Sequence, residues 1–188
     1  MWTLPNILTL LRIACIPLLV VVYYAPVQER YLLSGAIFGI AALTDWVDGY
    51  LARRLNQMTP FGAFLDPVAD KLIVAVALVV LLESRPMLLM ALPTMIIISR
   101  EILISALREW MAEMGKRTSV AVSMVGKVKT TLQMIAIALL LLADPAGGGI
   151  NGLLSGLGFL MLYIAAILTL WSMTIYLKAA WPDLSGRG

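Results

Sequence analysis

Two pairs of aspartates in an otherwise apolar chain are the residues whose spacing could do chemistry. Asp45 and Asp48 are three positions apart and Asp66 and Asp70 are four apart, so each pair shares one face of a helix. Carboxylates near a bilayer are costly unless a cation neutralises them. The chain has no histidine and one cysteine, and donor sets made of oxygen alone select hard cations. We therefore expect the four aspartates to hold Mg²⁺ or Mn²⁺, with two ions shared between them.

The residues between the two acid pairs suit a phosphate ligand. Gly49 and Gly62 lack side chains, so a nucleotide or phosphate could approach the backbone closely. Arg53 could donate a forked pair of hydrogen bonds to phosphate oxygens, and together with Arg54 it is expected in the short loop that joins the pairs. Two metal ions here would clamp a diphosphate and stabilise the leaving phosphate. The alternative is structural, with the acids paired to nearby cations and the glycines serving helix packing.

The elements that position these residues are expected to be membrane-spanning helices. Of the 188 residues, 61% are hydrophobic and 13% are charged, whereas soluble domains carry about 25% charged residues. The pattern predicts an all-α integral membrane protein, a single domain over residues 1–188, without strand-like alternation. A net charge of +3 is too small to argue for nucleic acid. Hydrophobic runs of about 20 residues fall at roughly 6–25, 31–52, 62–82, 87–112, 119–143 and 151–177.

Basic residues between the runs predict the orientation in the membrane. Only Arg30 and Arg85 fall on one side, so the other side is expected to be cytoplasmic, with both termini and the aspartates. We expect the first run to be a mature helix and not a cleaved signal peptide. Its opening segment could lie partly along the interface, with Arg12 directed to the headgroups. The basic residues on the expected cytoplasmic side are Arg53, Arg54, Lys116, Arg117, Lys178 and Arg187.

A second group of charges lies in the fourth and fifth runs. Arg100 is about a dozen residues, roughly 18 Å at about 1.5 Å per residue, from the cytoplasmic end of its run. That is too deep for easy snorkelling, so it should face a polar cavity or a partner. Glu101 and Arg108, seven apart on one face, could pair. We hypothesise that Arg100, Lys127 and Lys129, together with Arg108, bind the phosphate of an acceptor alcohol.

The aspartate segment forms the pattern D-x2-D-G-x2-A-R-x8-G-x3-D-x3-D, which resembles the signature of the CDP-alcohol phosphotransferase family. The segments REILISALREWMAEMGKR and SVAVSMVGKVKTT extend the resemblance over most of the chain. It implies a homodimer of six-helix bundles, each with a polar cavity open to the cytosol. It also implies that Asp70 is the general base, besides being a metal ligand with Asp45, Asp48 and Asp66. The positions that match contacts to the CDP moiety are Gly49, Ala52, Arg53 and Gly62.

The reaction implied by this resemblance is phosphatidyl transfer from CDP-diacylglycerol to sn-glycerol 3-phosphate, giving phosphatidylglycerophosphate and CMP. This would place the chain in anionic phospholipid synthesis at the bacterial cytoplasmic (inner) membrane. The same chemistry with serine, inositol phosphate or phosphatidylglycerol as acceptor remains open, although the cations of the fourth and fifth runs favour a phosphorylated one. An aspartate-rich prenyltransferase and a divalent-cation transporter are alternatives from other classes. Neither of them explains the Gly-Ala-Arg positions between the acids.

Overall fold

The computed structural model describes residues 4–55, 59–85, 87–115 and 124–185. Within these ranges, the side chains of residues 4–5, 45–55, 60, 63, 124–125, 127 and 183 lie outside the description. The described chain is helical throughout apart from its connections, which confirms the all-α prediction. The helices are α1 (Leu4–Tyr24), α2 (Arg30–Leu55), α3 (Pro60–Ser84), α4 (Leu88–Glu113), α5 (Met124–Leu142) and α6 (Ile150–Leu184).

Helices α2 and α6 end beyond the predicted apolar runs. Helix α2 continues through Arg53 and Arg54 to Leu55, so the prediction that the two arginines lie in a loop was wrong. Alanine, arginine and leucine are strong helix formers, and they extend α2 beyond the apolar run. Helix α3 begins after Thr59, whose hydroxyl accepts a hydrogen bond from the Gly62 amide at 3.0 Å and caps the helix. Helix α6 likewise extends past the predicted end at residue 177.

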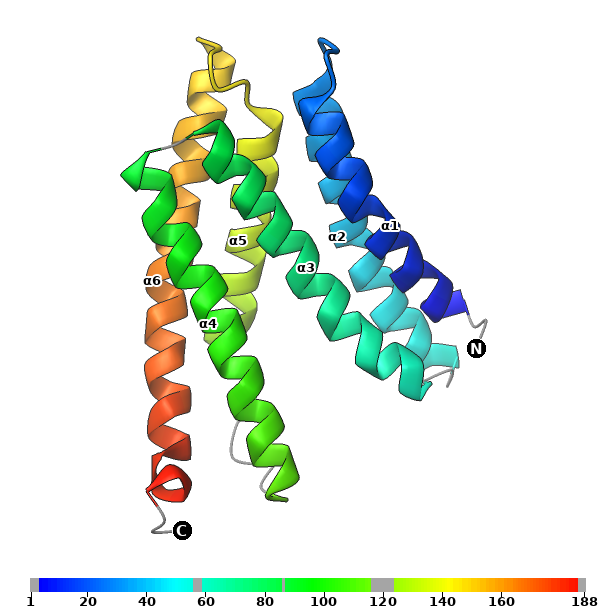
Figure 1. Ribbon diagram of the computed structural model, residues 1–188, viewed down its shortest axis with the longest axis vertical. Helices are drawn as coiled ribbons and strands as arrows, with labels where there is room; N and C mark the ends of the chain where they lie inside the picture. The colour runs from blue at the N-terminus through cyan, green and yellow to red at the C-terminus, as the bar shows by residue number, and fades with distance from the viewer. Residues whose placement is uncertain (1–3, 56–58, 86, 116–123, 186–188) are drawn as a thin grey trace.

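The helices run alternately up and down, so that α1 rises and α6 descends in the view of Figure 1. Helix α1 packs on α2 and α3, whereas α5 packs on α6 and α2 and α4 packs on α6. Small residues permit two of these approaches. A Cβ at Gly35 would lie 2.5 Å from the Leu142 side chain, and one at Gly158 would lie 2.7 Å from Leu140. The aspartates of α3 are thus held between a group formed by α1 and α2 and a group formed by α4, α5 and α6.

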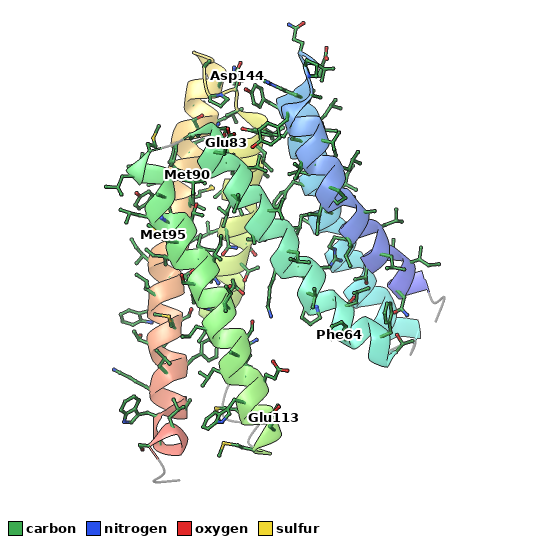
Figure 2. All side chains as sticks on the ribbon, in the orientation of Figure 1. Phe64, Glu83, Met90, Met95, Glu113 and Asp144 are labelled. Carbon is green, nitrogen blue, oxygen red and sulfur yellow. The ribbon has the colours of Figure 1, made fainter. Side chains whose placement is uncertain are left out.

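Side chains project outward from all the helices (Figure 2). Many large apolar ones are exposed, whereas several polar ones are buried. On α1, Leu11 is 55% and Val21 is 68% exposed, while Thr9 and Arg12 are buried. This inverted arrangement suits lipid as the surrounding medium, because exposed apolar faces cost nothing in a bilayer. Three stretches are long and apolar enough to cross a membrane: Asn6–Tyr24, Leu88–Glu113 and Ile150–Pro182. The protein is therefore a membrane protein with at least these three candidate spans in the described chain.

The burial of Arg12 contradicts the prediction that it reaches the headgroups. Its side chain is 1% exposed and forms an ion pair with Asp70 of α3. A cation at this depth is stabilised by a buried carboxylate and cannot reach the interface. The tertiary contact between α1 and α3 therefore determines where this arginine points.

Candidate active site

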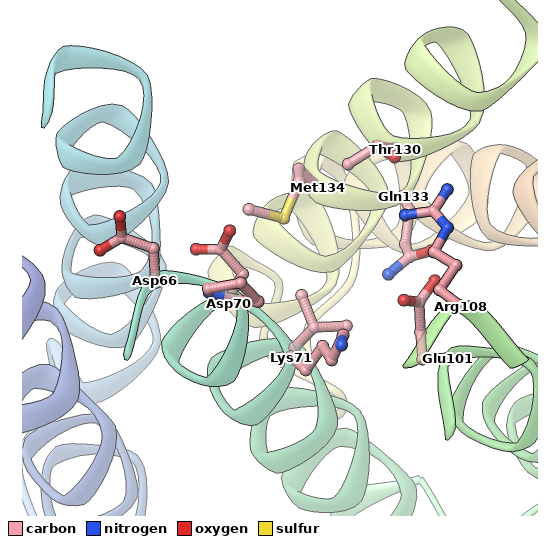
Figure 3. Close-up of a pocket in the computed structure, with 10 residues that line it drawn as sticks. Asp66, Asp70, Lys71, Glu101, Arg108, Thr130, Gln133 and Met134 are labelled. Carbon is pink, nitrogen blue, oxygen red and sulfur yellow. The ribbon is translucent and has the colours of Figure 1, made fainter. Parts of the chain in front are cut away.

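A cavity of about 340 Å³ lies between α3, α4 and α5, and two of the predicted metal-binding aspartates border it (Figure 3). Asp66 and Asp70 come from α3, while Glu101 and Arg108 come from α4 and approach from the opposite side (Figure 3). Both signs of charge therefore face one space, which suits a ligand with separate anionic and cationic contact points. The lining residues are Asp66, Pro67, Asp70, Lys71, Val74, Glu101, Arg108, Thr130, Gln133 and Met134.

The two α3 aspartates are held by donors from α1. Thr9 Oγ1 donates a hydrogen bond to Asp66 Oδ1 at 2.5 Å. Arg12 Nη1 donates to Asp70 Oδ1 in the ion pair. The Asp70 side chain nevertheless remains 43% exposed. Each carboxylate is therefore fixed on one side by α1 while part of it faces the cavity.

A polar stripe on α1, which was not predicted from the sequence, makes this arrangement possible. Asn6, Thr9 and Arg12 are each three positions apart and all are buried, so they lie on one face of the helix. Asn6 Oδ1 accepts a hydrogen bond from the N-cap residue Thr59 at 3.0 Å. The periodic N-x2-T-x2-R spacing in an apolar segment is a signal that could have identified this inward face.

Glu101, on the other side of the cavity, is partly exposed and pairs with two buried cations. It accepts hydrogen bonds from Lys129 Nζ at 2.6 Å and from Arg100 Nη1 at 3.0 Å. Arg100 also donates to Ser172 Oγ at 3.4 Å. Arg108 instead donates to Tyr176 Oη at 3.1 Å, with its guanidinium 5.2 Å from the centre of the tyrosine ring.

A family model for CDP-alcohol phosphatidyltransferases matches residues 2–171 of the chain. The chain belongs to this family. The resemblance inferred from the aspartate signature is thus confirmed, and the match covers every position of that signature.

Curated relatives of this CDP-alcohol phosphatidyltransferase share about half of its residues over nearly the full length. A protein of Salmonella choleraesuis is 54% identical over 183 residues, 97% of each chain. A protein of Escherichia coli K12 is 52% identical over the same share, as is one of Shigella flexneri. All three are named CDP-diacylglycerol--glycerol-3-phosphate 3-phosphatidyltransferase.

The family's other predicted metal and CDP contacts lie on α2, except Gly62 on α3. Asp45, Asp48, Gly49, Ala52 and Arg53 are within the helical range of α2, but their side chains lie outside the described residues. Their roles stay predictions.

The described part of the chain contains no group of three or more acids, histidines or cysteines that could hold a metal ion. Asp66 and Asp70, one turn apart and both bordering the cavity, supply only oxygen donors. That donor chemistry fits a hard divalent cation such as Mg²⁺.

Gly62 is buried, and the structure shows a packing reason for its missing side chain. A Cβ at this position would lie 2.6 Å from Asn6 Oδ1 and 3.2 Å from Thr59 Oγ1. The glycine therefore allows the start of α3 to approach the polar stripe of α1. The predicted contact between Gly62 and a CDP moiety stays a prediction.

The predicted acceptor-phosphate residues are only partly brought together. Arg108 lines the cavity, whereas Arg100 and Lys129 are buried and donate to Glu101. Glu101 thus pairs with these two cations, while Arg108 bonds Tyr176. The side chain of Lys127 lies outside the described residues, and the phosphate-binding roles stay predictions.

Two polar residues of the cavity, Lys71 and Gln133, were not predicted from the sequence. Lys71 follows Asp70 on α3, and Thr130 and Gln133 are one turn apart on α5. Gln133 is 4% exposed, and its Oε1 has no hydrogen-bond partner within the described structure. A buried polar atom that borders a cavity without a partner points to a ligand. The GKVKTTLQ spacing, with Gln133 three residues after Thr130, is the signal that could have identified it.

Proposed function

We propose that this chain transfers the phosphatidyl group of CDP-diacylglycerol to sn-glycerol 3-phosphate, giving phosphatidylglycerophosphate and CMP. The observation that carries the proposal is the cavity in which Asp66 and Asp70 face Arg108 and Gln133. The proposal is supported by relatives that bear this enzyme's name and are 52–54% identical over 97% of the chain. A phosphorylated acceptor also matches the cationic side chains of Lys71 and Arg108 at the cavity.

In the proposed reaction, a hydroxyl oxygen of the acceptor forms a bond to the phosphorus that carries diacylglycerol. The bond between this phosphorus and the oxygen of CMP breaks, and CMP leaves with that electron pair. The hydroxyl proton passes to the Asp70 carboxylate, which is partly exposed and borders the cavity. The chain has no histidine, so a carboxylate is the natural general base here.

Asp45, Asp48, Asp66 and Asp70 would hold the divalent ions of this enzyme. When bound, Mg²⁺ or Mn²⁺ stabilises negative charge on a diphosphate and its leaving group. Arg53 would add a hydrogen-bonded positive charge near the same diphosphate. Within this proposal, Gly49, Ala52 and Gly62 leave room for the nucleotide.

The acceptor would occupy the side of the cavity formed by α4 and α5. The Arg108 guanidinium is available to a phosphate, because Tyr176 satisfies only part of its donor capacity. Gln133 Oε1 would accept a hydrogen bond from the acceptor hydroxyl that does not react, because it has no other partner among the described residues. Arg100 and Lys129 would then act mainly through Glu101, adding positive potential behind the site.

The proposal includes the surroundings of the enzyme. All six helices would span the bacterial inner membrane, with both termini and the cavity on the cytosolic side. The alternating directions of the six helices support this topology (Figure 1). A homodimer is proposed from family resemblance.

The decisive experiment is CMP release by the purified protein in detergent with CDP-diacylglycerol and Mg²⁺. A panel of glycerol 3-phosphate, serine, inositol phosphate and phosphatidylglycerol would identify the acceptor. The proposal expects CMP release only with glycerol 3-phosphate, and its loss in EDTA. Release that depends on another alcohol would reassign the substrate, and the absence of release with all four would contradict the proposed function.

A further inference from the structure

Arg12 carries a buried charge that the proposed reaction does not use. It is 1% exposed and forms an ion pair with Asp70, at the inner face of α1 beside Thr9. A guanidinium so deeply enclosed remains charged and cannot swing into water. Any ligand that binds to Asp70 must therefore do so beside a fixed positive charge.

We propose that Arg12 is a built-in counter-charge that weakens the binding of a divalent cation at Asp70 until the donor's diphosphate is present. The proposal rests on the proposed function, which makes Asp70 a metal ligand and a CDP-linked lipid the donor. The guanidinium pairs with the Asp70 carboxylate and thereby links α1 to α3. Arg12 is thus a positioning residue that acts through Asp70 and does not touch the substrate.

Two effects of Arg12 on metal binding oppose each other, and their sizes determine the sign. The hydrogen bond from Arg12 orients the Asp70 carboxylate, which favours metal binding. The net contribution of one hydrogen bond to the binding free energy is only modest. The repulsion between the Arg12 guanidinium and a divalent cation on the same carboxylate is larger than this contribution, because nearby charges interact strongly where the dielectric constant is low. A diphosphate contributes negative charge that offsets this repulsion. The cation should therefore bind tightly only together with the nucleotide.

The test is a Mn²⁺ titration of the full-length protein in detergent without lipid substrate. Arg12→Gln keeps a hydrogen-bond donor but removes the charge, and it should bind Mn²⁺ at least about tenfold more tightly than the wild type. Arg12→Lys keeps the charge and should stay within about threefold of the wild type. Unchanged or weaker Mn²⁺ binding by Arg12→Gln would overturn the proposal.

Arg85 offers a matched control. It is also buried, but it donates to the backbone carbonyls of Leu140 and Ala143, and Arg85→Gln should leave Mn²⁺ affinity unchanged. An equal increase in this variant would show a nonspecific effect of lost charge and would contradict the role of Arg12.

A second measurement needs no variant and remains informative where Arg12→Gln fails to fold. In the wild type, bound CDP should raise Mn²⁺ affinity at least about tenfold after correction for Mn²⁺ held by CDP in solution. Equal affinities with and without bound CDP would overturn the proposal. CDP binding is measured in the same titrations, and CMP release is measured separately. A protein that lacks the proposed activity can therefore be distinguished from one in which Arg12 has no effect on Mn²⁺ binding.

Discussion

Lys129 of α5 donates a 2.6 Å hydrogen bond to Glu101 of α4, and Arg100 shares the same carboxylate oxygen. Because both cations are buried, removing the acid would leave two buried positive charges without this partner. Glu101→Gln should destabilise the protein by about 3–5 kcal/mol, the cost of breaking a buried ion pair. Thermal unfolding in detergent measures the change. Glu109→Gln, at an exposed position of the same helix, is the control, and equal melting temperatures for the two variants would contradict the prediction.

Asp70→Asn should retain binding of CDP-diacylglycerol but lose turnover by at least about a hundredfold, because the amide cannot accept the acceptor's proton. Lipid binding and CMP release, measured on the same preparation, separate these effects. Glu83→Gln changes an exposed acid at the far end of α3 and should leave turnover unchanged. Substantial activity in Asp70→Asn would assign the general base to another residue.

The sequence was sufficient to predict six helices, because apolar runs of spanning length interrupted by proline, glycine and charge leave few alternatives. The shared face of Asp66 and Asp70 followed from helical geometry alone. The orientation of Arg12 did not, because an arginine in the first half of an apolar helix fits a headgroup contact as well as a buried ion pair. Its partner lies 58 positions away, and only the packing of α1 against α3 decides between the two.

The same limit applies to the α4 cations. Their depth predicted a polar environment for Arg100, which the structure confirms with contacts to Glu101 and Ser172. Spacing along one helix suggested a pair between Glu101 and Arg108. Lys129 from α5 pairs with that acid instead, and helical periodicity carries no information about a neighbouring helix.

Gly62→Ala should destabilise the junction of α1 and α3 by about 1–3 kcal/mol, as overpacking does in a well-filled site. The new methyl group would lie 2.6 Å from Asn6 Oδ1, and Asn6 is itself buried. Thermal unfolding in detergent measures the change. Gly39→Ala is the matched control on α2, because nothing lies within 4 Å of its Cβ position. It should be neutral or stabilising, since alanine favours a helix. A melting temperature of Gly62→Ala at or above that of Gly39→Ala would show that the junction tolerates a side chain.

Gln133→Leu tests whether the unpartnered Oε1 recognises the second hydroxyl of the acceptor. With glycerol 3-phosphate, kcat/KM should fall about tenfold, because one hydrogen bond to the substrate is lost. With 3-hydroxypropyl phosphate, which lacks only this hydroxyl, kcat/KM should change by less than about threefold. Steady-state CMP release with both acceptors measures the difference. Met134→Leu, which alters an apolar side chain of the same cavity, should affect both acceptors alike. An equal loss of kcat/KM for both acceptors in Gln133→Leu would instead assign Gln133 a packing role. A distorted cavity lowers kcat/KM for both molecules, whereas a missing hydrogen bond lowers it only for the acceptor that makes this bond.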